Sequence, residues 1–283
     1  MVLSTFTLTN IISFPKANAT YVEGAITQDA IWTLVDSPFV VSKDVIVYPN
    51  VTLTIEPGVE VRFGRNFSLV IYGRLVANGT NDKMIIFTSN KVEPETGDWE
   101  TIKFNGTQPS FLVYCTIEYG KNGITVDNGV LNIKNSLIRH NSENAMEIAN
   151  GNVEVKNNEI VNNTMSGIYI ADGSKIIIQN NVIKSNGNGI TLDGNLTSEV
   201  DINQNNILSN TCGIYLKASA YYKTLITNNT ISENSYGFYI STNTSTYITR
   251  NYIFNNTNGI LYKNGNNHKA YFNDIYNNTM GMD

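Results

Sequence analysis

Histidine, cysteine and charged residues are all scarce in this chain. Its 283 residues include two histidines and two cysteines, and charged side chains make up 15%. Copper and zinc sites gather several His, Cys or Met ligands, yet neither His140 nor His268 has a second histidine or cysteine at ligand spacing. The sequence therefore predicts no metal centre built on these residues.

Positive charge and long apolar runs are missing as well. The chain has 19 Lys and Arg against 24 Asp and Glu, so it lacks the basic footprint of nucleic-acid-binding proteins and the polybasic patch that binds anionic membranes. After residue 19 no apolar run is long enough to cross a bilayer. Hydrophobic residues still make up 41%, which is too many for a disordered chain. We expect a folded protein with no nucleic-acid partner and no membrane span.

The first 19 residues are expected to be a secretion signal peptide. Residues 1–14 are mildly apolar, and Ala17-Asn18-Ala19 fits the small-x-small pattern of a cleavage site. The usual basic segment is missing, so we expect the natural start to lie upstream; a disordered leader is the alternative reading. A cleaved signal would make the protein secreted or cell-surface.

A repeat runs through the second half of the chain, and two columns of residues define it. Both columns advance in steps of 22 to 24 residues, so each repeat is one structural unit. The first column, mostly glycine followed by an apolar residue, is Gly123, Ala145, Gly167, Gly189, Gly213, Gly237, Gly259 and Gly281. The second column, asparagine two residues before isoleucine, is Asn158, Asn181, Asn205, Asn229, Asn251 and Asn273, with Ser136 in the leading position.

The pattern within each repeat predicts strands. Residues one and three after the column glycine are apolar, as in Ile168 and Ile170, and the residue between them is polar or tyrosine. This period of two indicates a strand with one buried face, and a helical stripe is absent. The leucine scaffold of leucine-rich repeats is absent too. The sequence therefore predicts an all-β, right-handed parallel β-helix, a solenoid with coils of about 22–24 residues stacked about 4.8 Å apart.

The asparagine column is expected to be structural. Each asparagine lies two residues before an inward isoleucine, so it should also point inward, where its amide must be satisfied. Stacked asparagines can hydrogen-bond along the stack, and asparagine tolerates the left-handed bend of a coil corner. We expect the column glycines to relieve similar corner strain. A ligand site on this column is the alternative.

The front half repeats less cleanly. Residues 20–110 are expected to form an N-terminal cap and the first coils, and residues 111–283 the regular coils, with the C-terminal cap missing. Cys115 and Cys212 lie four coil steps apart, roughly 19 Å, which is too far for a disulfide. We therefore expect two packed free thiols.

Several segments resemble a known family. They are residues 51–59 (VTLTIEPGV), 73–80 (GRLVANGT), 86–89 (IFTS) and 97–99 (GDW), followed by the later Asn-x-Ile…Gly-Ile repeats. These resemble the right-handed β-helix repeats of the carbohydrate-binding and sugar-hydrolase group, which includes NosD-type copper-binding periplasmic proteins and surface-layer or adhesin-like proteins. The resemblance covers nearly everything after residue 21. It implies the fold more strongly than a function, because this fold carries lyases, hydrolases, epimerases and scaffolds.

Two sets of side chains are candidate sites. Asp127, Asp172 and Asp193 lie four or five residues after a column glycine, so they are expected near one corner. Asp172 and Asp193 fall on neighbouring coils, about 5 Å apart, where the pair could hold calcium or act on a glycosidic bond. All three also begin Asp-Gly or Asp-Asn-Gly turns, which is the simpler reading. Tyr169, Tyr215 and Tyr239 share one outward position, with Glu147 and Thr191 as polar neighbours, and could form a stacking surface for sugars. An aromatic ladder that only stabilises the sheet is the alternative. No catalytic residue is assigned.

Acceptor sequons for N-glycosylation are frequent. They begin at Asn50, Asn66, Asn78, Asn105, Asn162, Asn195, Asn228, Asn243, Asn255 and Asn277. In a chain rich in Asn, Ser and Thr some of these arise by chance, but the pattern fits a secreted glycoprotein.

The sequence as a whole predicts a secreted or cell-surface, structural or adhesin-like β-helix protein whose extended face contacts carbohydrate or cell envelope. A polysaccharide lyase, hydrolase or epimerase, or a carbohydrate-binding module, is the main alternative; a NosD-like copper-handling protein is a weaker one. No cofactor beyond calcium is expected. The last residues lie in what should be a new strand, so we expect this edge to dock on another chain or on a missing segment.

Overall fold

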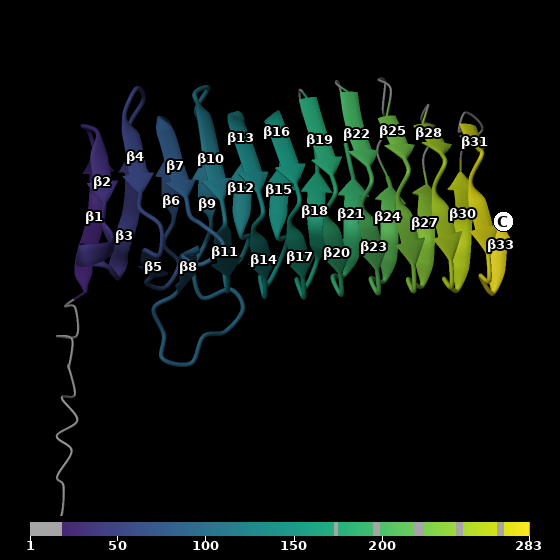
Figure 1. The fold of residues 1–283 in the computed structure, drawn as a ribbon, viewed down its shortest axis with the longest axis horizontal. Helices are drawn as coiled ribbons and strands as arrows, with labels where there is room; N and C mark the ends of the chain where they lie inside the picture. The colour runs from purple at the N-terminus through teal and green to yellow at the C-terminus, as the bar shows by residue number, and fades with distance from the viewer. Residues whose placement is uncertain are drawn as a thin grey trace, which may run out of the picture.

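The computed structural model describes residues 19–172, 175–194, 199–217, 224–241, 246–264 and 269–282. This part of the chain forms a parallel β-solenoid (Figure 1), so the predicted fold class is confirmed. Its only helical element is the short 3-10 helix η1 (Leu34–Asp36). The predicted signal peptide lies almost entirely outside the described residues.

Each coil contributes one strand to each of three faces, and on every face the strands pair in parallel with those of the neighbouring coils. The first face is an 11-stranded sheet made of β2 (Ala30–Trp32), β4 (Thr52–Ile55), β7 (Arg74–Asn78), β10 (Pro109–Val113), β13 (Gly129–Lys134), β16 (Gly151–Lys156), β19 (Lys175–Gln179), β22 (Glu199–Asn203), β25 (Thr224–Thr227), β28 (Thr246–Thr249) and β31 (Lys269–Tyr271).

The second and third faces are continuous with each other at the N-terminal end. The second contains β5 (Glu60–Phe63), β8 (Ile85–Ser89), β11 (Cys115–Glu118), β14 (Leu137–Arg139), β17 (Glu159–Val161), β20 (Val182–Lys184), β23 (Asn206–Leu208), β26 (Thr230–Ser232), β29 (Tyr252–Phe254) and β32 (Asp274–Tyr276). The third contains β6 (Leu69–Ile71), β9 (Ile102–Phe104), β12 (Ile124–Val126), β15 (Met146–Ile148), β18 (Ser166–Ile170), β21 (Asn188–Leu192), β24 (Cys212–Leu216), β27 (Tyr236–Ser241), β30 (Asn258–Asn264) and β33 (Met280–Met282). Two long strands, β1 (Thr20–Ile26) and β3 (Phe39–Val47), run across both faces.

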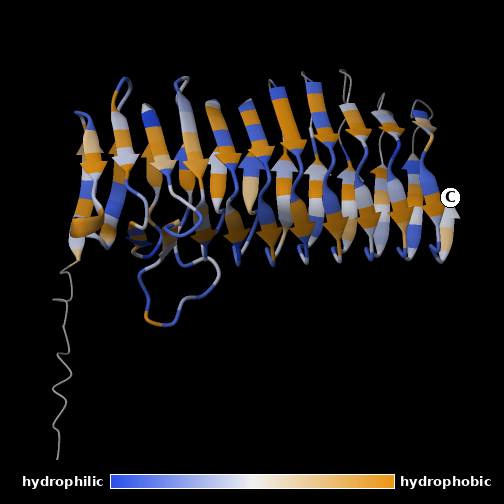
Figure 2. Ribbon diagram, in the orientation of Figure 1, coloured by the Kyte–Doolittle hydropathy of each residue, from blue (hydrophilic) through white to orange (hydrophobic). Residues whose placement is uncertain are grey.

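The core follows from the period-two pattern. Apolar side chains alternate with polar ones along the strands (Figure 2), and the inward set is fully buried. In the regular coils that set is almost entirely isoleucine, leucine and valine, whose branched side chains suit a pleated surface. The first coils use larger side chains: the rings of Phe63 and Trp99 stack with centroids 4.1 Å apart.

The asparagine column lies inside the stack. The side chain of each of its members from Asn158 to Asn251 is buried, and its Nδ2 donates to Oδ1 of the next asparagine, as in Asn181 to Asn205 at 2.9 Å. The same Nδ2 also donates to a carbonyl of the preceding coil, Val155 O in the case of Asn181. Each amide is therefore satisfied by the stack itself, which is how a polar column can lie within an apolar core.

A second asparagine column was not predicted. It runs at the corner between the second and third faces and makes the same coil-to-coil hydrogen bonds. Its members are Asn141, Asn163, Asn186, Asn210, Asn234, Asn256 and Asn278. The same repeat spacing was present in the sequence and would have revealed it.

The left-handed backbone conformation at the coil corners was predicted for the column asparagines, and this was wrong: it lies one residue earlier. None of the asparagines in the first column has a positive φ; the residue before each of them does, as in Asn157 (56°) and Arg250 (57°). The column asparagine must direct its amide inward, so the left-handed conformation falls on its exposed neighbour. Even Phe272 adopts it, with φ 55°.

The explanation for the glycine column was also wrong. These glycines do not have a positive φ. All of them except Gly281 lie so close to the next coil that a side chain would collide with it: a Cβ on Gly189 would be 2.5 Å from the carbonyl oxygen of Gly213. Close approach between coils, not backbone conformation, explains why glycine is needed there.

Candidate functional site

The third face has one outward column in its middle coils. Glu147 pairs with Tyr169, Tyr169 with Thr191, Thr191 with Tyr215, and Tyr215 with Tyr239. Their neighbours on both sides in each strand are buried in the core. Because successive side chains of a strand point to opposite faces, these five side chains project outward.

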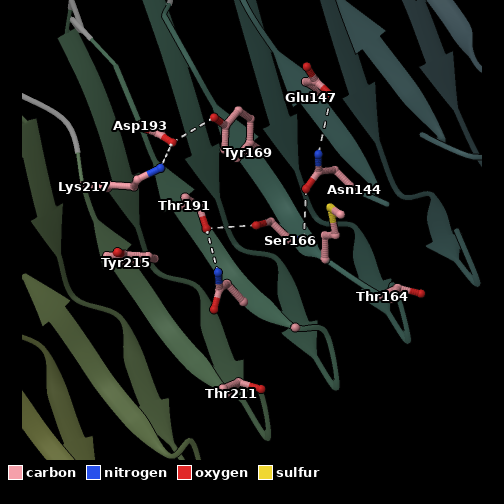
Figure 3. Close-up of a pocket in the computed structure, with 13 residues that line it drawn as sticks. Asn144, Glu147, Thr164, Ser166, Tyr169, Thr191, Asp193, Thr211, Tyr215 and Lys217 are labelled. Atoms are coloured by element: carbon pink, nitrogen blue, oxygen red, sulfur yellow. Dashed lines mark hydrogen bonds and ion pairs between the residues drawn. The ribbon is translucent and has the colours of Figure 1, made fainter. Parts of the chain in front are cut away.

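A groove of about 640 Å³ lies over this column on β15, β18, β21 and β24 (Figure 3). Its lining is polar and aromatic: Asn144, Glu147, Thr164, Met165, Ser166, Tyr169, Gly187, Asn188, Thr191, Asp193, Thr211, Tyr215 and Lys217. Of the residues predicted for a site, the groove brings together Tyr169, Tyr215 and Asp193.

Tyr169, Asp193 and Lys217 form a connected group at one side of the groove. The hydroxyl of Tyr169 donates to Oδ2 of Asp193 at 3.0 Å, and Nζ of Lys217 lies 2.6 Å from the same oxygen. Burial, together with the hydrogen bond to Asp193 and its negative charge, raises the pKa of Tyr169 above its ordinary value. The hydrogen bond to Asp193 likewise raises the pKa of Lys217. At neutral pH the phenol of Tyr169 is therefore protonated, and it lies beside the ion pair between Asp193 and Lys217.

Hydroxyl and amide groups, together with the carboxylate of Glu147, line much of the remainder of the groove. The hydroxyls of Ser166 and Thr191 are 2.9 Å apart, and Asn188 Nδ2 donates to Thr191 Oγ1 at 3.2 Å. Oε2 of Glu147 accepts from Asn144 Nδ2 at 3.5 Å. Such groups can donate to and accept from a ligand rich in hydroxyls.

Tyr239 lies beside the groove in an adjoining hollow of about 180 Å³, which it shares with Tyr215 and Tyr236. Its ring meets the rings of both nearly at right angles, with centroids 5.0 Å and 5.4 Å away. Three tyrosines therefore form an aromatic corner that continues the groove toward the C-terminal coils.

The sequence pattern missed several lining residues for one structural reason. Strict alternation places Ser166, two residues before the buried Ile168, on the inward side. The pairing, however, passes from Ser166↔Asn188 to Ile168↔Ile190 without a partner for the glycine between them. Alternation breaks at this point, and the residues before the column glycines, including Tyr236, line the outer groove and hollow.

The three predicted aspartates do not form one acidic cluster. Asp127 lies next to Lys103, with 2.5 Å between Oδ2 and Nζ, and is separated from Asp193 by the coils of β15 and β18. The pairing Ile170↔Leu192 places Asp172 level with Gly194 instead of Asp193. In the described part of the chain no three His, Cys, Asp or Glu side chains gather where they could hold a metal ion.

The histidines and cysteines have separate environments. The ring of His140 stacks on Tyr119 with centroids 5.7 Å apart, and His268 lies outside the described residues. Cys115 and Cys212 are free, buried thiols, as predicted. Burial raises the pKa of the Cys115 thiol and raises that of Cys212 to about 12, so neither is a reactive thiolate at neutral pH.

The glycosylation candidates lie mainly at exposed corners. Asn195 and Asn243 are outside the described residues, and Asn105 is half-buried. The other candidates are exposed: Asn50, Asn66, Asn78, Asn162, Asn228, Asn255 and Asn277. In the described ranges no helix has the length and apolarity to cross a membrane.

Comparison with known proteins shows the family. Residues 100–253 and 197–283 match the family described as "Right handed beta helix region", and the chain belongs to it. A 66-residue segment is 35% identical to the protein bark beetle of Drosophila melanogaster; the match spans 23% of this chain and 2% of that protein. Among solved structures, the A-module of the mannuronan C-5 epimerase AlgE6 from Azotobacter vinelandii is similar over 92% of this chain and 88% of its own, with TM-score 0.49 and 12% identity.

Proposed function

We propose that this β-helix protein works outside the cell as an adhesin-like surface protein and binds polysaccharide in the groove of its third face. The observation that carries the proposal is the groove itself: two tyrosines, Tyr169 and Tyr215, among hydroxyl and amide groups on a rigid stack of strands. Aromatic rings offer apolar faces to sugar C–H groups, and the polar groups around them match sugar hydroxyls.

The direction of the outward column on the third face is the second observation that supports carbohydrate binding. The column runs along the solenoid axis, with one outward position every coil, or about 4.8 Å. A linear polysaccharide lying along the axis would meet equivalent positions on successive coils, from Glu147 to Tyr239. Exposed sequons at the corners are compatible with a glycosylated, secreted protein.

A glycan array probed with the purified protein tests the proposal. Tyr169→Ala combined with Tyr215→Ala should reduce binding at least tenfold. Tyr48→Ala is the matched control, because Tyr48 is exposed but lies at the N-terminal end, outside the groove. If no glycan binds, or if the double variant binds as well as the original chain, the groove is not the site.

A polysaccharide-acting enzyme is the second candidate, and one observation favours it. The hydroxyl of Tyr169 lies 3.0 Å from Oδ2 of Asp193, and Glu147 pairs with Tyr169 on the neighbouring strand of the same groove. A phenol and two carboxylates in one groove are groups that could transfer protons to and from a bound sugar. Product analysis by mass spectrometry and NMR on any glycan that binds would separate the two candidates. Cleavage, elimination or epimerisation that Asp193→Asn abolishes would establish catalysis; an unchanged glycan would leave binding as the function.

A further inference from the structure

The charges of the groove point to the chemical class of its ligand. We propose that the groove takes an uncharged glycan and rejects polysaccharides that carry carboxylate or sulfate groups. This inference rests on the proposed function, since it concerns the same groove, and it goes further by naming the ligand class.

Among the residues that the structure describes, the groove offers no free cation to an acidic sugar. Within this described lining, the only ammonium group is that of Lys217, which lies 2.6 Å from Oδ2 of Asp193. Acidic polysaccharides are recognised by arginine or lysine side chains that are free to pair with the ligand. Here the cation is already paired with a carboxylate of the groove itself.

The second carboxylate in the groove, that of Glu147, is held by amides instead of a cation. Its Oε2 accepts from Asn122 Nδ2 at 3.1 Å and from Asn144 Nδ2 at 3.5 Å. No ion pair within 4.0 Å involves Glu147 in the described ranges. The three charged side chains of the groove, Glu147, Asp193 and Lys217, therefore sum to a net charge of −1.

The neighbouring coils do not reverse this sign. Beside Glu147, the ammonium of Lys121 lies 3.2 Å from Glu100 and 4.0 Å from Glu143, so one cation serves two flanking carboxylates. Lys103, which is in register with Glu147 two strands away, is paired with Asp127 and adds no net charge. Among these described residues, the remaining charges are four carboxylates, Glu100, Glu143, Glu147 and Asp193, and two ammonium groups, Lys121 and Lys217. A ligand carboxylate would enter a region of net negative charge, where like charges repel.

The groups that remain for a ligand are neutral. Thr164 and Thr211 are exposed at the groove and Asn188 is half-buried there, whereas Ser166 and Thr191 are buried and hydrogen-bonded to each other in its floor. These hydroxyls and amides match the hydroxyl and acetamido groups of neutral sugars. The carboxylate of Glu147 is itself an acceptor for sugar hydroxyls, so its charge assists a neutral ligand and opposes an acidic one.

Calorimetry on matched pairs of oligosaccharides tests this ligand class. Each pair has the same length and linkage and differs only in the C6 group: glucan against glucuronan, mannan against mannuronan, galactan against galacturonan, with chitin oligosaccharides as a further neutral probe. We expect the neutral member of a bound pair to bind at least tenfold more tightly, about 1.4 kcal/mol. Added salt should lower the ratio of neutral to acidic affinity, because salt screens the repulsion between the ligand carboxylates and the groove.

Glu147→Gln should also lower the ratio of neutral to acidic affinity several-fold, because it improves binding of the acidic oligosaccharide. Glu159→Gln is the control, since it removes a carboxylate on the second face and should leave the ratio unchanged. If an acidic oligosaccharide binds as tightly as its neutral partner or more tightly, the inference is overturned while the groove remains a glycan site. If neither member of any pair binds, the proposed function itself fails.

Discussion

Nδ2 of Asn205 donates a hydrogen bond to Oδ1 of Asn229, one coil further along the stack, at 3.0 Å. Oδ1 of Asn205 in turn accepts from both the backbone N–H and the side chain of Asn181 in the coil before it. Each amide of the column is thus donor and acceptor at once, so the column connects coils that are 22 to 24 residues apart in the chain. The stability of the solenoid depends on this continuity as well as on its apolar core.

Asn205→Ala should destabilise the protein strongly. The substitution leaves the buried backbone N–H of Asn181 without its acceptor, and an unsatisfied group of this kind costs about 1–3 kcal/mol. It also removes the hydrogen bonds between the Asn205 side chain and the side chains of Asn181 and Asn229. We expect the free energy of unfolding in urea to fall by about 3 kcal/mol. Asn206→Ala, at the next and exposed position, should stay within about 0.5 kcal/mol. Equal effects of the two substitutions would contradict a structural role for the column.

Gly189→Ala should destabilise the stack by overpacking. The added Cβ would lie 2.5 Å from the carbonyl oxygen of Gly213 and 2.7 Å from a methyl of Ile207, so the coils must separate locally. The expected loss in unfolding free energy is about 1–3 kcal/mol. Gly281→Ala provides the control in the same column, because its Cβ would meet nothing within 4 Å. Thermal denaturation of both variants measures the difference, and a neutral Gly189→Ala would refute the close-approach explanation.

Stability should fall at alkaline pH because of the buried thiols. Burial raises the pKa of both cysteines in the folded state, whereas the unfolded thiols ionise near their ordinary value of about 8.5. The folded state therefore binds more protons above that pH, and the stabilisation present below it is lost as pH rises. The slope should approach about 1.4 kcal/mol per pH unit for each thiol. Urea denaturation at several pH values from 8 to 10 measures it, and Cys115→Ala should remove one thiol's share; a slope that the variant leaves unchanged would argue against this origin.

The ionisation of Tyr169 should report the charges of the groove. Burial and Asp193 raise the pKa of Tyr169, while Lys217 lowers it. Asp193→Asn should therefore lower the pKa of Tyr169, and Lys217→Met should raise it further. Tyrosine carries a ring carbon that is sensitive to ionisation, so NMR of labelled protein can follow the titration, with Tyr169→Phe identifying the signal among 16 tyrosines. Shifts of the same sign in both variants would show that the group is not arranged as in Figure 3.

Periodic features of the sequence predicted periodic features of the structure. The alternation around Ile168 and Ile170 placed both in the core, and the 22-to-24-residue steps of the asparagine column set the length of each coil. The backbone conformations predicted for the asparagine and glycine columns were wrong. The close approach of Gly189 to Gly213 depends on the distance between coils, which no stretch of one repeat contains.

The outward tyrosines show where sequence reasoning reached its limit at the site. Tyr169, Tyr215 and Tyr239 could be aligned by counting from the column glycines, and the structure places them in one register. Tyr236 could not, because the glycine that follows it has no pairing partner, and at this point in the strand Tyr236 lies outward against the alternation.

The sequence by itself therefore determined the solenoid, its coil length and its inward columns, since these follow from a period of two within strands and from a repeat that is stacked identically. Only the tertiary structure decided the groove. Tyr169, Asp193 and Lys217 are separated by 24 residues at each step, and whether their side chains meet depends on rotamers and on where the alternation breaks. Those are set by packing between neighbouring coils, and local residue patterns do not encode them.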